Sequence, residues 1–297
     1  MSVSGGRSYY TTDGSGTAFS TLDLEVASNG DPRVVYAFTT TADHSHNDNI
    51  YFGYSNDGGT TWETPLTIND VTTAGNTEGR STAFPRMVID DRDRIFVSYV
   101  RGTTRGGGTD DVMLAKINHH VSPFAQVPVG STGTSGSTGG VRLTPDNQRE
   151  TGPDLAVGDG DRLQVVFFSH TNQRIEHKRM ATDTTWMRTD HQETTGSPVT
   201  SFAHTRLWNL ALEEDASFYF PTIAVDRGRT PDRIYLVYKW GNATHGPTFG
   251  EVVAQPGGAP ESIGWNQADD PAVGVTQAAT WGTAQTVWTT GTTPLFN

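Results

Sequence analysis

Cysteine is absent from this chain of 297 residues, which excludes disulfide bridges, thiol nucleophiles and thiolate metal ligands. No run of about 18 apolar residues occurs either, and a membrane-spanning helix needs that length. The sequence also lacks a Gly-x-x-x-x-Gly-Lys phosphate loop, a Gly-x-Ser-x-Gly nucleophile turn and a His-Glu-x-x-His zinc pair. We therefore expect no cofactor and no insertion into a membrane.

Positive charge is scarce, because 21 Lys and Arg residues face 33 Asp and Glu residues, for a net charge of -12. This balance disfavours nonspecific binding to nucleic acid or to an anionic membrane, and it leaves neutral or cationic partners open. Residues 1–7 lack the apolar core of a signal peptide. The expectation is that a presequence has been removed, or that the protein reaches its place without one, as a component of a virion or other particle assembled inside cells does.

Glycine is abundant, at 33 residues, and aromatic residues make up 10% of the chain. Together with frequent threonine, this composition is typical of many short strands joined by tight turns. No segment has the periodicity of a long amphipathic helix. The composition predicts an all-β protein, and chains of this length often form one all-β domain.

A repeat runs through the chain. Pro85, Pro153 and Pro221 stand at equal spacing, and each begins an apolar run that is followed by a polar turn and a second apolar run. An earlier copy without the proline begins at Leu22. Third strands are expected at 50–54, 112–117, 174–179 and 249–254, and fourth strands that carry or follow an aromatic residue at Trp62, Phe124, Trp186 and Trp265.

Four antiparallel strands that recur with an aromatic residue predict the blades of a β-propeller. We predict a single propeller domain over residues 1–297, with five blades and with six as the alternative. The four visible blades are expected near 22–70, 85–130, 153–200 and 221–267. Residues 271–297 together with 1–21 are expected to form the closing blade, which would remove the exposed sheet edges.

The sharpest motif lies between the apolar run 50–54 and the run that ends at Ile68. Its sequence predicts a glycine turn in which Asp57 accepts hydrogen bonds from the turn, Gly58 and Gly59 adopt positive φ, and Trp62 anchors the hairpin in a core. The segment matches the Ser-x-Asp-x-Gly-x-Thr-Trp signature of the Asp-box at Ser55, Asp57, Gly59, Thr61 and Trp62.

By this motif the chain resembles the sialidase-like Asp-box (BNR repeat) β-propellers, and residues 182–186 keep part of a second copy. In that family the Asp-box is architectural and lies away from the active site. Sialidases hold the substrate carboxylate with three arginines, use a Tyr/Glu pair as nucleophile and an Asp as acid/base. The Arg-Ile-Pro segment that normally carries the first arginine is missing here.

The function expected from this resemblance is a noncatalytic carbohydrate-binding or protein-binding structural module, as a part of a virion or other larger assembly. The alternative is an exo-acting glycoside hydrolase of sialidase type that works at the mouth of the central tunnel. The candidate catalytic residues lie where first strands begin, because these strands face the axis of a propeller. They are Asp23, Glu25, Arg86 and Asp154.

Three further sets of residues have more than one interpretation. Trp240, Trp281 and Trp288 could stack on sugar rings or pack between blades. His44 and His46 stand two apart and could share a metal ion, but a solvated loop is the default because no third ligand is evident. Residues 90–94 resemble a calcium loop in acidity, yet their arginines favour a charged hairpin turn.

Overall fold

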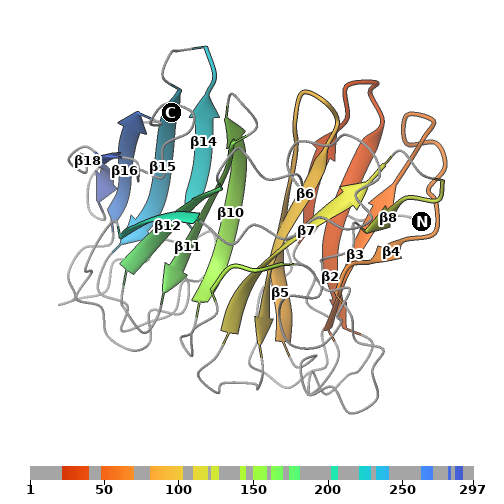
Figure 1. The fold of residues 1–297 in the computed structure, drawn as a ribbon, viewed down its shortest axis with the longest axis horizontal. Coiled ribbons are helices and arrows are strands. Elements are labelled where there is room, and N and C mark those ends of the chain that lie inside the picture. Colours follow the sequence, from red (N-terminus) through yellow and green to blue (C-terminus); the bar gives the residue numbers. More distant parts are fainter. Residues whose placement is uncertain are drawn as a thin grey trace. The chain divides into compact units, whose positions relative to one another are not determined.

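The computed structural model describes fifteen stretches of the chain, and the statements below concern these alone. They are residues 22–39, 48–69, 81–102, 110–119, 122–126, 141–144, 150–158, 162–169, 174–180, 202–206, 221–228, 232–240, 262–269, 280–281 and 285–289. All of their regular structure is β-strand, so the predicted all-β class is confirmed (Figure 1). No helix in these stretches is long and apolar enough to cross a membrane.

The strands form four antiparallel sheets, which we call blades 1 to 4. Blade 1 contains β1 (Leu22–Val26), β2 (Pro32–Thr39), β3 (Asp48–Tyr54) and β4 (Leu66–Thr67), hydrogen-bonded in this order. Blade 2 contains β5 (Ser81–Ile89), β6 (Ile95–Gly102), β7 (Asp110–Asn118) and β8 (Ala125–Gln126), and β9 (Val141–Arg142) also pairs with β7. The up-and-down order is that of a propeller blade.

Blades 3 and 4 follow the same order. Blade 3 contains β10 (Glu150–Gly158), β11 (Arg162–Ser169), β12 (Arg174–Met180) and β13 (Phe202–Arg206). Blade 4 contains β14 (Thr222–Asp226), β15 (Arg233–Trp240), β16 (Ser262–Asp269) and β17 (Thr280–Trp281), and β18 (Gln285–Thr289) also pairs with β16.

The outer strands of blades 3 and 4 differ from the sequence prediction. The fourth strand of blade 3 is β13, whereas the sequence placed it near Trp186, which lies outside the described residues. The third strand of blade 4 is β16, which pairs with β15 along its whole length, and the predicted strand at 249–254 lies outside the described residues. An apolar run alone does not fix a strand, because pairing over the full length of the neighbour decides the register.

The C-terminal strands also lie elsewhere than expected. We assigned residues 271–297 to a closing blade, but β17 and β18 in this segment pair with β16 and so belong to blade 4. The third strand of blade 4, β16, lies later in the chain than predicted. The strands that follow it, β17 and β18, therefore complete blade 4. Residues 1–21 lie outside the described residues, and ring closure and the number of five blades stay predictions.

The chain divides into two compact units. The first is Met1–Gln148 with Asp183–Val199, and it contains blades 1 and 2. The second is Arg149–Thr182 with Thr200–Asn297, and it contains blades 3 and 4. A single domain over the whole chain stays a prediction.

The core of the first unit lies between blades 1 and 2. Alternate side chains of β2 and β3, among them Val35 and Phe52, point toward β5, β6 and β7, which contribute Met87, Tyr99 and Met113. These side chains are at most 3% exposed. The period of two residues in the apolar pattern therefore places one face of each blade against its neighbour.

The glycine turn between β3 and β4 has the conformation that its sequence predicts at Gly58 and Gly59, with φ of 70° and 91°. Asp57 Oδ1 accepts hydrogen bonds from Thr61 N and Ser55 Oγ, and its Oδ2 accepts one from Thr61 Oγ1. These bonds lower the pKa of Asp57 to about 2; the hydroxyl of Thr61 has the largest effect. The carboxylate thus closes the turn from within.

Trp62 packs on the face of blade 1 that lies opposite the core between blades 1 and 2. It is half-buried and packs over Gly53, where an added Cβ atom would lie 3.8 Å from the indole ring. Gly53 alternates along β3 with Phe52 and Tyr54, which point into the core between blades 1 and 2. Trp62 therefore covers the opposite face of blade 1, because Gly53 leaves space there for its ring.

Candidate functional site

The first strand of blade 1 carries two carboxylates that point toward blade 2. Asp23 and Glu25 stand two residues apart on β1, so their side chains share one face of the strand. Asp23 Oδ2 accepts a hydrogen bond of 2.9 Å from Met87 N on β5, and its Oδ1 accepts one of 3.1 Å from Leu24 N. The structure therefore brings Asp23 and Glu25 together beside the first strand of the next blade.

Glu25 is the carboxylate in this pair whose surroundings favour the neutral form. Burial raises the pKa of Glu25 above its ordinary value, and the negative charge of Asp23 raises it further. Within the described part of the chain, the Glu25 side chain makes no hydrogen bond or ion pair. A carboxylate that is half-buried next to another carboxylate is destabilising, and such groups are concentrated at functional sites.

Replacing Glu25 by glutamine is expected to stabilise the protein at pH 7. The pKa of Glu25 is raised in the folded state, so the folded state binds its proton more tightly and ionisation costs stability as the pH rises through that pKa. Glutamine cannot ionise, so the gain should vanish below about pH 4, where Glu25 is protonated in both states. Urea unfolding of the wild type and of Glu25→Gln between pH 3 and 8 measures this gain in the free energy of unfolding. Equal stability of the two proteins at every pH would contradict this assignment.

Arg86 does not join this pair on one face. It lies on β5, opposite Ser98 on β6, and is followed by Met87, whose side chain is buried in the core between blades 1 and 2. Because side chains alternate along a strand, Arg86 points to the other face of β5. Arg86 therefore does not lie on the face of β5 that packs against blade 1.

Asp154 lies in the second unit, where it repeats the contact of Asp23. Its Oδ2 accepts a hydrogen bond of 2.9 Å from Ile223 N on β14, the first strand of blade 4. Asp154 is half-buried on β10. Two of the four candidate catalytic residues thus hold neighbouring blades through the backbone, which is a structural use of the carboxylate.

The other candidate binding residues are placed only in part. Trp240, Trp281 and Trp288 lie on β15, β17 and β18 of blade 4, and their side chains are outside the described part of the structure. His44 and His46 fall outside the described residues altogether. Among the residues that are described, no group of three or more His, Asp and Glu side chains could hold a metal ion.

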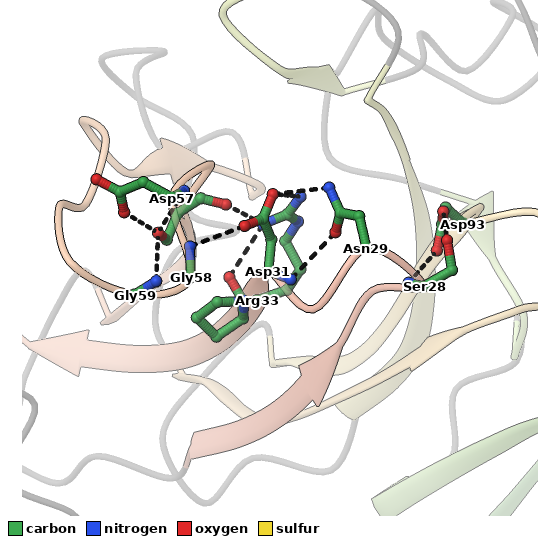
Figure 2. Close-up of polar contacts among 10 residues, drawn as sticks. Ser28, Asn29, Asp31, Arg33, Asp57, Gly58, Gly59 and Asp93 are labelled. Atoms are coloured by element: carbon green, nitrogen blue, oxygen red, sulfur yellow. Dashed lines mark hydrogen bonds and ion pairs between the residues drawn. The ribbon is translucent and has the colours of Figure 1, made fainter.

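Buried arginines form a feature that the sequence interpretation missed. Arg33 donates Nη1 hydrogen bonds to the carbonyls of Ser55 and Pro32, and its Nη2 lies 3.7 Å from Asp31 Oδ2. Burial lowers the pKa of Arg33, and the charge of Asp31 partly offsets this effect. Asp31 Oδ1 in turn accepts a hydrogen bond from Gly58 N, so the arginine and the aspartate fasten the glycine turn to the β1–β2 turn (Figure 2).

The sequence repeat contains a pattern that could have identified these arginines. An arginine stands near the beginning of the second strand in all four blades, and the two in the first unit, Arg33 and Arg94, are at most 4% exposed. Arg94 pairs with Asp90 in the β5–β6 turn. The charged hairpin turn predicted at 90–94 is present, between β5 and β6.

Comparison with known proteins supports the fold alone. No known family matches the sequence, and no curated protein matches it either. Among solved structures, an ulvan lyase of polysaccharide lyase family PL25 is similar, with a TM-score of 0.55, 11% sequence identity and coverage of 91% of this chain. An α-L-arabinanase from Penicillium chrysogenum has a TM-score of 0.47 and 13% identity over 90% of this chain, too low to carry an argument.

The chain spans 56% of the length of the ulvan lyase. At this level of identity the similarity says nothing about activity. The similarity in fold agrees with the four sheets of antiparallel strands in up-and-down order. The fold is that of an all-β propeller.

Proposed function

We propose that this chain is a noncatalytic β-propeller that binds carbohydrate at the inner strands of its blades, with Glu25 as the central contact. The observation that carries the proposal is the position of Glu25, half-buried beside Asp23 on the first strand of blade 1. Carboxylate oxygens accept hydrogen bonds from sugar hydroxyl groups. The ulvan lyase, whose fold is similar, has also been seen bound to a GlcA–Rha3S saccharide.

The assignment of residues 55–62 to an Asp-box is part of this proposal. The bonds of Asp57 within the turn and the contact of Trp62 with Gly53 support an architectural role for the segment. If residues 55–62 are architectural, the ligand binds to other parts of the blades. Membership in a virion or other particle stays a prediction.

Asp23 is the reason for preferring binding to catalysis. Both of its oxygens accept backbone hydrogen bonds, and a carboxylate held in this way is a poor candidate for a nucleophile or a general base that must turn toward a substrate. Glycoside hydrolysis normally needs a pair of carboxyl groups with different roles. Asp23 is the carboxylate whose charge acts on Glu25, and its backbone hydrogen bonds make it a poor catalytic partner for Glu25.

A glycoside hydrolase is the second candidate, and the raised pKa of Glu25 favours it. A general acid must keep its proton near neutral pH, and burial beside another carboxylate is how enzymes achieve this. In this case Glu25 would protonate the leaving oxygen.

Binding to a panel of immobilised neutral and uronic-acid oligosaccharides tests the proposal, together with an assay for released reducing ends. We expect saturable binding of at least one glycan, a loss of about tenfold or more in affinity for Glu25→Ala, and no product. Glu63→Gln is the matched control, because Glu63 is exposed in the hairpin. Product formation that Glu25→Gln abolishes would establish the hydrolase, and equal binding by wild type and Glu25→Ala would overturn the site.

A further inference from the structure

The contact between first strands is the same in both units. Asp23 Oδ2 binds Met87 N across 64 residues of sequence, and Asp154 Oδ2 binds Ile223 N across 69 residues. Both distances are 2.9 Å. The two aspartates occupy one position of the repeat, and Met87 and Ile223 both stand two residues after the proline that begins the next copy. We call this hydrogen bond the first-strand latch.

The far ends of the same strands are also joined. In the first unit, Ser28 in the β1–β2 turn donates its N–H and its hydroxyl to the two oxygens of Asp93 in the β5–β6 turn, at 2.8 and 2.5 Å (Figure 2). In the second unit, Arg227 Nε donates to the carbonyl of Val157 at 2.7 Å. The chemistry differs, and Val157 lies in β10 itself, whereas Ser28 lies in the turn after β1. In both units a contact near the end of one first strand reaches the turn that follows the next first strand, so each pair of first strands is held at both ends.

Burial of Asp93 alone would raise the pKa of its carboxyl group. The hydrogen bonds from Ser28 outweigh this effect, and the charges of His119 and Arg33 add to them, so that the pKa lies below its ordinary value. The tie between these turns is therefore made by the ionised carboxylate. Its contribution to stability is present at neutral pH and is lost as the pH falls through the pKa of Asp93 in the folded state.

Blades 2 and 4 lack the aspartate that forms the latch. The position of the latch aspartate holds Arg86 in blade 2 and Thr222 in blade 4. Arginine has no hydrogen-bond acceptor in its side chain, and Thr222 is exposed. Among the four blades that the structure describes, the latch is a feature of blades 1 and 3, which we call leading blades, and blades 2 and 4 are following blades.

The end of the first strand alternates in the same way. Following blades have an aspartate there, Asp90 or Asp226, whose Oδ1 accepts the N–H two residues later at 3.0 and 2.9 Å, respectively. The corresponding positions of the leading blades hold Ala27 and Gly158. Two independent positions therefore separate the four blades into the same two classes.

We infer that the structural repeat of this chain is a pair of blades, in which the leading blade holds the following blade through the first-strand latch. The division into two compact units agrees, because each unit contains one leading and one following blade. The aspartates are positioning residues. Asp23 fixes β1 against β5, and so it also fixes the place of Glu25 relative to blade 2.

Amide hydrogen exchange of the full chain tests this inference without reference to any ligand. In Asp23→Ala, the Met87 amide loses its acceptor, and we expect it to exchange about tenfold faster or more, while the Ile223 amide keeps its rate. In Asp154→Ala, the effects should be reversed. Thr222→Ala is the matched control, because it changes the same position of the repeat in a following blade, and it should alter neither amide.

The same exchange measurement can contradict the inference. If either alanine variant accelerated both amides alike, or neither, the blades would not be coupled as pairs. Should an alanine variant fail to fold, Asp23→Asn and Asp154→Asn retain an acceptor oxygen and give a smaller effect on the same single amide. Native-state exchange of the wild type at increasing urea gives a further result: amides of blades 1 and 2 should open together, and separately from those of blades 3 and 4.

Discussion

Replacing Asp90 by alanine is expected to lower the free energy of unfolding of the first unit by about 3–5 kcal/mol. Asp90 Oδ2 pairs with the guanidinium of Arg94, with an Nε distance of 2.5 Å, and its Oδ1 accepts hydrogen bonds from Arg92 N and Arg94 N. The side chains of Asp90 and Arg94 are 0% and 1% exposed. Removing the carboxylate leaves the charge of Arg94 buried without this counterion. The free-energy cost of burying that charge is larger than the net stabilisation that the ion pair contributes.

Urea unfolding followed by circular dichroism measures this loss, and two variants separate its causes. Asp90→Asn keeps an acceptor for the turn but not the charge, so its loss should be smaller. Asp91→Ala changes an exposed neighbour and should stay within about 0.5 kcal/mol of the wild type. If Asp90→Ala were as stable as Asp91→Ala, the buried ion pair would have no role in holding the β5–β6 turn.

Replacing Phe52 by alanine is expected to cost about 3–5 kcal/mol, because it opens a cavity between blades 1 and 2. Phe52 is fully buried on β3, and its ring stacks with Tyr54 at 5.9 Å and with Phe124 at 6.2 Å between centroids. Phe124 comes from blade 2 and also donates its N–H to the Tyr54 hydroxyl. The aromatic cluster thus joins the two blades, and its loss should affect both.

Thermal and urea unfolding check the Phe52 variant against Leu24→Ala. Leu24 lies on β1 but is 52% exposed, so its truncation should cost less than about 1 kcal/mol. Phe52→Leu retains most of the buried volume and should fall between the two variants. Similar losses for Phe52→Ala and Leu24→Ala would mean that this core does not hold blades 1 and 2 together.

Much of the fold could be predicted because the first two strands of each blade are local in the sequence. An apolar run, a polar turn and a second apolar run specify an antiparallel pair, and this holds from β1–β2 through β14–β15. The glycine turn was predictable for the same reason, since Gly58 and Gly59 act within a few residues of Asp57.

The outer strands were harder because their partners are distant in sequence. In blade 4 the third strand follows a long segment that offers more than one apolar run, and pairing with β15 selects 262–269. The contact that Trp62 makes could not be derived from its own segment, for a related reason. It depends on the absence of a side chain at Gly53, on the neighbouring strand.

The candidate site shows what sequence patterns leave out. Spacing places Asp23 and Glu25 on one face, but the hydrogen bond that engages Asp23 comes from Met87, on another blade. Asp23, Arg86 and Asp154 stand at equivalent positions in the repeat, yet the structure gives Asp23 and Asp154 a latch and turns Arg86 to another face. Such differences between equivalent positions arise from contacts between blades, which periodicity within a blade does not encode.

The central claim is that binding occurs at the inner strands around Glu25 and that the hairpin at residues 55–62 is architectural. An amide chemical shift titration with the oligosaccharide that binds best in the glycan panel tests both parts in one measurement. We expect saturable shifts at residues of β1 and β5 near Glu25 and Met87, and none at the hairpin. Shifts confined to residues 55–62, or the absence of any saturable shift, would contradict the account.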